Sequence, residues 1–136
     1  MQMGLKIKRN GIYYVRLVAC GYSQVAGVDF NEVPYSSVIN DVIYHLLLVL
    51  SLVHGYSCVI VDVERAFLHG ELEAEEEIYM ECPQGMEDSK NKVWCLKKTI
   101  YGLVQAAKAF YKKLTQVLKS IGFECGIIDS CLLTRK

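Results

Sequence analysis

One acid, Asp62, stands near the end of the apolar stretch SCVIVDV at residues 57–63. The β-branched residues of this stretch predict a buried strand. A carboxylate at that position has two candidate roles. It can bind a hard cation such as magnesium, or it can accept hydrogen bonds from backbone N–H groups and cap the turn that follows. The residues taken alone favour the capping role.

A second candidate site is a basic stripe near the C-terminal end of the chain. Lys108, Lys112 and Lys119 fall on the polar face of a predicted helix, where they could make weak contacts with nucleic-acid phosphates. A solvated helix face explains the same spacing at least as well. The formal net charge of the chain is zero, so its composition gives no global electrostatic argument for nucleic acid.

The cysteines show no metal-binding pattern. None forms a C-x-x-C pair, and no histidine follows at zinc-finger spacing. We therefore expect reduced, mostly buried thiols in an intracellular protein. A Cys–His nucleophile built on Cys58 lacks any supporting spacing. The six cysteines are Cys20, Cys58, Cys82, Cys95, Cys125 and Cys131.

Two helices are predicted. Asn40 is a favourable N-cap for a helix over residues 41–54, and Gly55 is a favourable stop. That segment is apolar nearly all round, so we expect it to be the most buried part of the chain. It is too short to span a bilayer, which needs about 20 residues. The second helix, over residues 104–121, is amphipathic and ends at Gly122.

Short apolar segments bounded by turn residues predict the strands. Besides residues 57–63, they lie at residues 11–21, 78–82 and 92–98, with a last strand beginning near Ile127. Between them we expect a long loop at 22–37, a short helix or turn at 65–70, an acidic solvated loop at 71–77 and a turn at 83–91. The pattern is that of one α+β domain, with no signal peptide at its N-terminus.

Several blocks in order resemble the copia-type reverse transcriptases of long-terminal-repeat retrotransposons. They are RLVACGYSQVAGVDFNEV, VDVERAFLHGELEAEEEIYMECPQGM, KVWCLKKTIYGLVQA and YKKLTQVLKSIGFECGIIDSCLL. The resemblance runs from about residue 6 to the end of the chain. It implies the fingers and the first part of the palm over residues 1–136, with a mixed sheet packed by the two main helices.

The resemblance also implies roles for individual residues. Asp62, with the backbone of Val63, matches a magnesium-binding and catalytic position. Phe67 matches an aromatic gate that excludes a ribose 2′-hydroxyl, although an ordinary core Phe is an equal alternative. The remaining nucleotide-binding positions implied by the family are Arg16, Arg65, Tyr101 and Gly102. The implied partners are an RNA or DNA primer–template, deoxynucleoside triphosphates and the rest of a polyprotein.

Some residues depart from the family pattern. The family has lysines where this chain has Tyr14 and Cys20, and Glu64 replaces a further lysine. Its second metal-binding motif, Tyr-x-Asp-Asp, is expected beyond the last residue, and no Asp-Asp pair occurs in the chain. We therefore expect a polymerase fragment that is inactive alone, in the cytoplasm and its virus-like particles and not in a membrane. The alternative is a decayed or domesticated fragment that at most binds nucleic acid or protein weakly.

Overall fold

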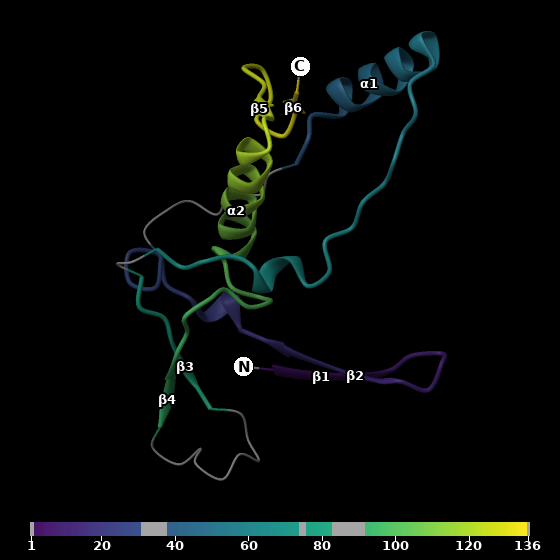
Figure 1. Ribbon diagram of the computed structural model, residues 1–136. Coiled ribbons are helices and arrows are strands. Elements are labelled where there is room, and N and C mark those ends of the chain that lie inside the picture. The colour runs from purple at the N-terminus through teal and green to yellow at the C-terminus, as the bar shows by residue number, and fades with distance from the viewer. Residues whose placement is uncertain (1, 31–37, 74–75, 83–91, 136) are drawn as a thin grey trace.

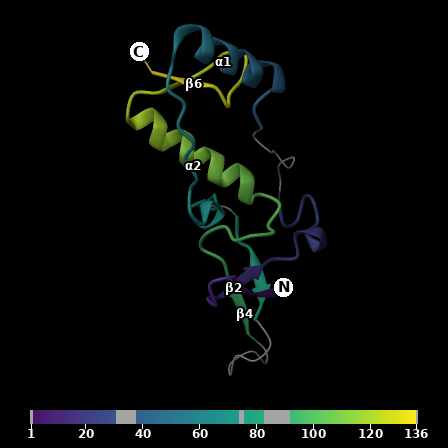
Figure 2. The same cartoon turned by 90° about the vertical axis from the view of Figure 1, so that its right-hand side faces the viewer.

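The computed structural model describes residues 2–30, 38–73, 76–82 and 92–135. It shows an α+β chain with two α-helices, α1 (Asp41–His54) and α2 (Ala106–Ser120). Both views place α1 and the β5/β6 hairpin at one end of α2, and the other two hairpins at its opposite end (Figure 1, Figure 2). The predicted α+β class and both predicted helices are thus confirmed.

The N-terminal hairpin pairs β1 (Gln2–Ile7) with β2 (Tyr13–Val18) in an antiparallel register that places Gly4 opposite Arg16. The strand predicted at residues 11–21 is β2. Its partner β1 was not predicted, although Met3, Leu5 and Ile7 recur at every second position of QMGLKI. The hairpin projects from the body of the chain (Figure 1).

The remaining strands form two short hairpins. β3 (Tyr79–Glu81) pairs with β4 (Val93–Cys95), and β5 (Glu124–Cys125) pairs with β6 (Leu133–Thr134), both antiparallel. The strands at 78–82 and 92–98 are therefore confirmed, and the turn at 83–91 lies outside the described residues. Within the described residues the chain forms separate two-stranded sheets, so the predicted mixed sheet is wrong.

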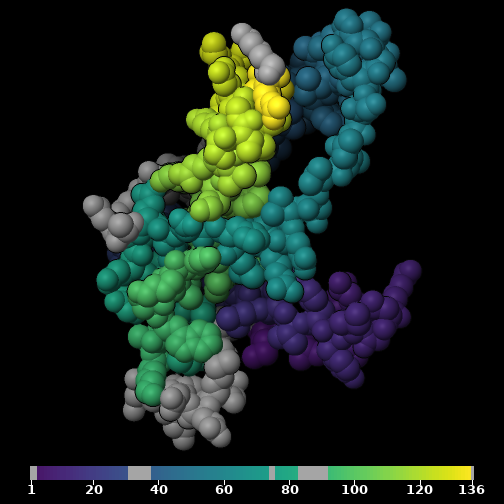
Figure 3. All heavy atoms as spheres, viewed as in Figure 1, coloured from purple at the N-terminus to yellow at the C-terminus, as the bar shows by residue number. Residues whose placement is uncertain are grey.

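The ends of α1 follow the prediction, but its burial does not. The Asn40 side chain accepts a hydrogen bond from the Val42 N–H at 2.9 Å, and Gly55 adopts the left-handed conformation with φ 67°. No residue of α1 is buried, and Leu52 is 84% exposed. Apolar residues on all sides of a helix indicate that packing against another element would stabilise it, but they do not identify that element. No other described element supplies that cover (Figure 3).

Residues 57–63 form an extended connection and not the predicted strand. Val59, Ile60 and Val61 are 82%, 99% and 81% exposed. β-Branched residues favour extended backbone, but a strand also needs a neighbour for its hydrogen bonds. The accessible surface of the chain is 11065 Å², against about 7,200 Å² for a folded monomer of this mass. Much of the apolar surface that we predicted to be buried is therefore exposed to solvent.

Helix α2 carries the predicted amphipathic pattern, but two polar groups in and beside it are buried. Gln105, just before the helix, is only 8% exposed, and the hydroxyl of Thr115 is buried. Gln105 is buried because it belongs to a polar junction. Its Nε2 donates to the Asp29 carbonyl at 3.3 Å, and its Oε1 accepts from Gln24 Nε2 at 3.1 Å. This junction fixes the segment after β2 against the start of α2.

The core is small and lies where α2 begins. Ile78, Leu103 and Ala106 are its buried apolar residues. The fully buried Thr99 sits beside them, with its hydroxyl 2.5 Å from the Phe67 carbonyl oxygen. The Thr99 hydroxyl is also 3.2 Å from the carbonyl oxygen of Gly70. The partly buried residues packed against the core are Ala19, Phe67, Leu72, Leu96 and Ile100.

All six cysteines are free, but none is buried. Cys58 is exposed, and the other five are partly exposed. The expected burial of these thiols is therefore wrong, for the same reason that α1 is exposed: few described segments pack over one another.

Thr99→Val is expected to lower the free energy of unfolding by about 1–3 kcal/mol, because it removes the buried hydroxyl that donates to the Phe67 carbonyl oxygen, while the Gly70 carbonyl keeps the Thr99 N–H. Denaturant unfolding measures the change. Thr134→Val, at an exposed position of β6, is the matched control and should change the free energy by less than about 0.5 kcal/mol. An equal effect of the two substitutions would contradict this role of Thr99.

The hairpin β5/β6 is expected to loosen in acid. The N–H groups of Asn40 and Cys131 donate to Asp129 at 2.8 and 2.7 Å, and they lower the pKa of its carboxyl group. The stabilisation is complete above the usual Asp pKa of about 3.9 and is lost as the pH falls through the lower folded value. Amide chemical shifts of these two N–H groups should therefore move only below about pH 4. In Asp129→Asn this acid transition should be absent.

Candidate functional site

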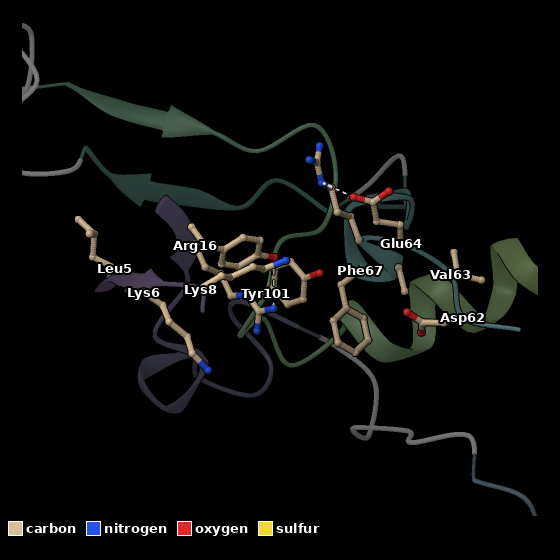
Figure 4. A pocket seen from close by; sticks show the side chains of 13 residues that line it. Leu5, Lys6, Lys8, Arg16, Asp62, Val63, Glu64, Phe67 and Tyr101 are labelled. Carbon is tan, nitrogen blue, oxygen red and sulfur yellow. Dashed lines mark hydrogen bonds and ion pairs between the residues drawn. The ribbon is translucent and has the colours of Figure 1, made fainter. Parts of the chain in front are cut away.

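Three segments that are distant in the sequence enclose one pocket of about 720 Å³. They are the hairpin β1/β2, the residues around η2 (a 3-10 helix, Ala66–Leu68) and the segment that carries Tyr101. Figure 4 shows their side chains facing this space. The lining residues are Gly4, Leu5, Lys6, Lys8, Tyr14, Arg16, Asp62, Val63, Glu64, Arg65, Ala66, Phe67 and Tyr101.

Most of the residues predicted from the sequence meet in this pocket. Arg16 comes from β2, and Tyr101 comes from the segment before α2. Asp62, Val63, Arg65 and Phe67 line the pocket from residues 62–67. Sequence reasoning gave Lys6 and Lys8 no place in this site, because only the register of the hairpin brings them to it.

Gly102 is the predicted nucleotide-binding residue that does not line the pocket. It has φ 88°, and a Cβ built on it would collide with the carbonyl oxygen of Ala19. The Ala19 N–H donates to the Tyr101 carbonyl oxygen at 2.7 Å. Glycine is therefore required here for the close approach of two backbones. That approach attaches the end of β2 to the segment carrying Tyr101.

Aromatic contacts connect the pocket to the core. The Phe67 ring lies edge-on to Tyr101 with centroids 5.5 Å apart, and edge-on to Phe110 of α2 at 6.2 Å. Phe67 also packs against the buried core. The two roles weighed for Phe67 are therefore compatible, because one part of the ring packs inward while the residue lines the pocket.

Arg16 lies between two aromatic rings. Its guanidinium carbon is 4.4 Å from the centroid of Tyr101 and 5.6 Å from that of Tyr14. Its Nη2 also donates to the Tyr14 hydroxyl at 3.4 Å. This hydrogen bond and the positive charge of Arg16 lower the pKa of Tyr14, and the same bond raises the pKa of Arg16. Lys8 adds a further cation 5.2 Å from the Tyr14 centroid.

Arg65 has an uncommon backbone conformation for its residue type. It has φ 56° and ψ 37° at the N-cap of η2 and is the only non-glycine residue with positive φ among those described. The left-handed region costs an L-residue with a Cβ roughly 1–2 kcal/mol. Its Nε lies 3.6 Å from Glu64 Oε1, an exposed pair that solvent screens strongly. This strained residue lines the pocket. Strained backbone conformations are often found at functional sites.

Asp62 is exposed, and within the described residues its carboxylate accepts no hydrogen bond. The capping role favoured by the residues alone therefore has no support. Magnesium needs several hard oxygen ligands in octahedral geometry. No group of three or more His, Cys, Asp or Glu residues in the described ranges could hold a metal ion. Asp62 and the nearby Glu64, which faces Arg65, do not make a complete magnesium site.

The basic stripe on α2 is partly neutralised by the acidic loop. Lys112 pairs with Glu73 at 2.9 Å, and Lys113 pairs with Glu71 at 2.7 Å. The hydrogen bond and charge of Lys113 lower the pKa of Glu71. Lys119 is exposed near the end of the helix, and Lys108 is partly buried. The described part of the acidic loop thus lies against the helix and is not a wholly solvated face.

A family comparison matches residues 4–136 to the family described as reverse transcriptase (RNA-dependent DNA polymerase). The match covers nearly the whole chain, and the chain therefore belongs to this family. It is a copia-type reverse transcriptase region, as the sequence resemblance indicated.

The relatives are Pol polyproteins of plant transposons. The chain is 36% identical over 138 residues to the retrovirus-related Pol polyprotein from transposon TNT 1-94 of Nicotiana tabacum, covering 96% of this chain and 10% of that polyprotein. Those from transposons RE1 and RE2 of Arabidopsis thaliana are 37% and 38% identical over 122 residues, covering 88% of this chain and 8% of each polyprotein. No solved structure matches the chain significantly.

The chain therefore spans about a tenth of the length of the polyproteins it matches. Among the helices of the described residues, none has the length and apolar composition that crossing a membrane requires.

Arg65→Gly is expected to raise the free energy of unfolding by about 0.5–1 kcal/mol, because glycine adopts the left-handed conformation without a steric cost. Part of the gain is offset by the greater freedom of glycine in the unfolded chain. Arg65→Ala removes the same charge but keeps the Cβ, so it should give no such increase. Denaturant unfolding of the two variants makes the comparison, and equal stabilities would show that the backbone of Arg65 is not strained.

Proposed function

We propose that the pocket between β1/β2, η2 and Tyr101 binds a deoxynucleoside triphosphate for the reverse-transcriptase domain to which this region belongs. The observation that carries the proposal is the convergence of the residues chosen by resemblance. Arg16, Arg65, Phe67, Tyr101 and Asp62 come from three segments and line a single pocket. Nothing in their spacing along the sequence requires that meeting.

The chemistry of the lining supports a nucleotide. Four cationic side chains face two carboxylates in the pocket, which favours an anionic ligand. Aromatic rings from two segments give flat apolar surface for a base or a sugar. In this arrangement Phe67 is the proposed gate against a ribose 2′-hydroxyl. The four cations are Lys6, Lys8, Arg16 and Arg65, and the two rings are those of Phe67 and Tyr101.

Asp62 is proposed as one ligand of a divalent cation, magnesium, with the backbone of Val63 beside it. A single exposed carboxylate does not hold magnesium against water. We therefore propose that the chain does not polymerise by itself. The chain holds no Asp-Asp pair that could supply the second acidic motif of the family.

The wider assignments are proposals of the same kind. Residues 1–136 would form the fingers and the first part of the palm, working with the rest of the polyprotein on an RNA or DNA primer–template inside the cell. Weak contacts of Lys108, Lys112 and Lys119 with the primer–template belong here too. The ion pair between Lys112 and Glu73 would oppose a contact of Lys112 with phosphate. Lys119 is therefore a better candidate for such a contact than Lys112.

Calorimetric titration with a deoxynucleoside triphosphate tests the site. Arg16→Gln should weaken binding by about tenfold, because charge-assisted hydrogen bonds to phosphate are worth roughly 1.5–3 kcal/mol. Arg135→Gln removes the same charge outside the pocket and should leave the dissociation constant unchanged.

A primer-extension assay with magnesium should show no incorporation by the chain alone.

Two results would contradict the proposal. If Arg135→Gln weakened binding as much as Arg16→Gln, the attraction would be general and not local to the pocket. Primer extension that Asp62→Asn abolished would show that the chain contains a complete catalytic site.

A further inference from the structure

We propose that Tyr14 is a positioning residue: with the ring of Tyr101 it holds the Arg16 guanidinium at the pocket, ready to bind the triphosphate group of a nucleotide. This inference rests on the nucleotide site proposed above. It gives a role to a residue that departs from the family pattern, where a lysine would be expected.

The geometry restrains Arg16 from two sides. Tyr14 and Arg16 are two residues apart on β2, so their side chains leave the same face of the strand. The guanidinium carbon lies 4.4 Å from the ring centroid of Tyr101, and Nη2 lies 3.4 Å from the Tyr14 hydroxyl. The register places Gly4, which has no side chain, opposite Arg16.

A restrained arginine binds an anion better than a mobile one. An arginine on an exposed strand loses much rotamer freedom when it binds a ligand. Here the two rings and the hydroxyl have already selected one arrangement before any ligand arrives. The planar guanidinium can still donate from its remaining N–H groups, in the fork geometry that suits phosphate oxygens.

The charges around Tyr14 point to an anion as the ligand. Within the described residues, Arg16 forms no ion pair with a carboxylate. Lys8 stands over the Tyr14 ring, and the positive charge of Arg65 also reaches its hydroxyl. Among these three cations, Arg65 alone has an acidic partner within the described residues, Glu64. A polyphosphate would neutralise this excess of positive charge.

The affinity test measures dissociation constants for a deoxynucleoside triphosphate, for inorganic tripolyphosphate and for the uncharged deoxynucleoside. Tyr14→Phe keeps the ring and removes the hydroxyl, and it should weaken binding of both anions by about threefold. Tyr14→Leu also removes the ring and should weaken it by about tenfold. The matched control is Tyr13→Phe, which alters an exposed neighbour outside the pocket and should have no effect.

A double-mutant cycle separates positioning from direct contact. If Tyr14 acts through Arg16, Tyr14→Phe should have no further effect in the Arg16→Gln background. A nuclear magnetic resonance measurement without ligand gives a second readout. The Arg16 Nε–H resonance should be shifted by the ring of Tyr101, and Tyr14→Phe should move it toward the position of a mobile arginine. A merely structural role of Tyr14 would leave that resonance in place.

Each outcome decides something different. Failure of the unaltered chain to bind the triphosphate would overturn both the nucleotide site and this inference. Binding that Tyr14→Phe leaves unchanged would overturn this inference alone. Equal weakening by Tyr14→Phe with and without Arg16 would show that Tyr14 itself contacts the ligand. Weaker binding of the uncharged deoxynucleoside in Tyr14→Phe would show a general distortion of the pocket, which also contradicts positioning.

Discussion

The hydroxyl group of Thr99 joins the turn after Asp62 to the segment that carries Tyr101. It reaches the carbonyl oxygens of Phe67 and Gly70, while the Thr99 N–H donates to Gly70 at 3.1 Å. Gly70 is buried against Thr99 and Ala109 with no room for a Cβ. These contacts hold η2 beside the start of α2, and the pocket exists only where those two segments and the hairpin meet. The small core around Leu103 and Ala106 stabilises the same junction.

The contrast with α1 shows what such a junction provides. α1 has favourable caps at both ends and an apolar sequence, yet its side chains are exposed. Helices of this length are marginal in water without tertiary packing. Its N-terminal end is held by the bond between the Asn40 N–H and Asp129, and the connection that follows it is extended and exposed. Local signals define where this helix begins and ends, but they do not determine which other element packs against it.

The sequence predicted what depends on neighbouring residues. Caps at Asn40 and Gly55, the amphipathic period of α2 and the turn at η2 are all local, and all are confirmed. The segment at 57–63 failed as a strand because strand formation needs a partner that composition does not reveal. The burial of Gln105 could not be predicted for a similar reason, because its amide group pairs with Gln24 and Asp29 from a distant loop.

The candidate site divides in the same way. Resemblance selected Arg16, Phe67 and Tyr101, and all three line the pocket. It could not select Lys8 or the interaction of Tyr14 with Arg16, because both depend on how the hairpin is registered and aimed. Gly102 was selected for a ligand, whereas its observed role is to let the backbone of Ala19 approach.

The attachment of the hairpin has a mechanical consequence. β2 meets the rest of the chain where Val18 and Ala19 pair with Tyr101, and the strands extend away from that joint (Figure 1). Six strand residues span about 20 Å, so a rotation of about 10° at the joint would carry the far end through roughly 3–4 Å. Lys8, at the turn end, would travel much farther than Arg16 near the joint. Such a rotation would therefore leave Arg16 almost in place beside Tyr101, while it would change the distance of Lys8 from the opposite side of the pocket.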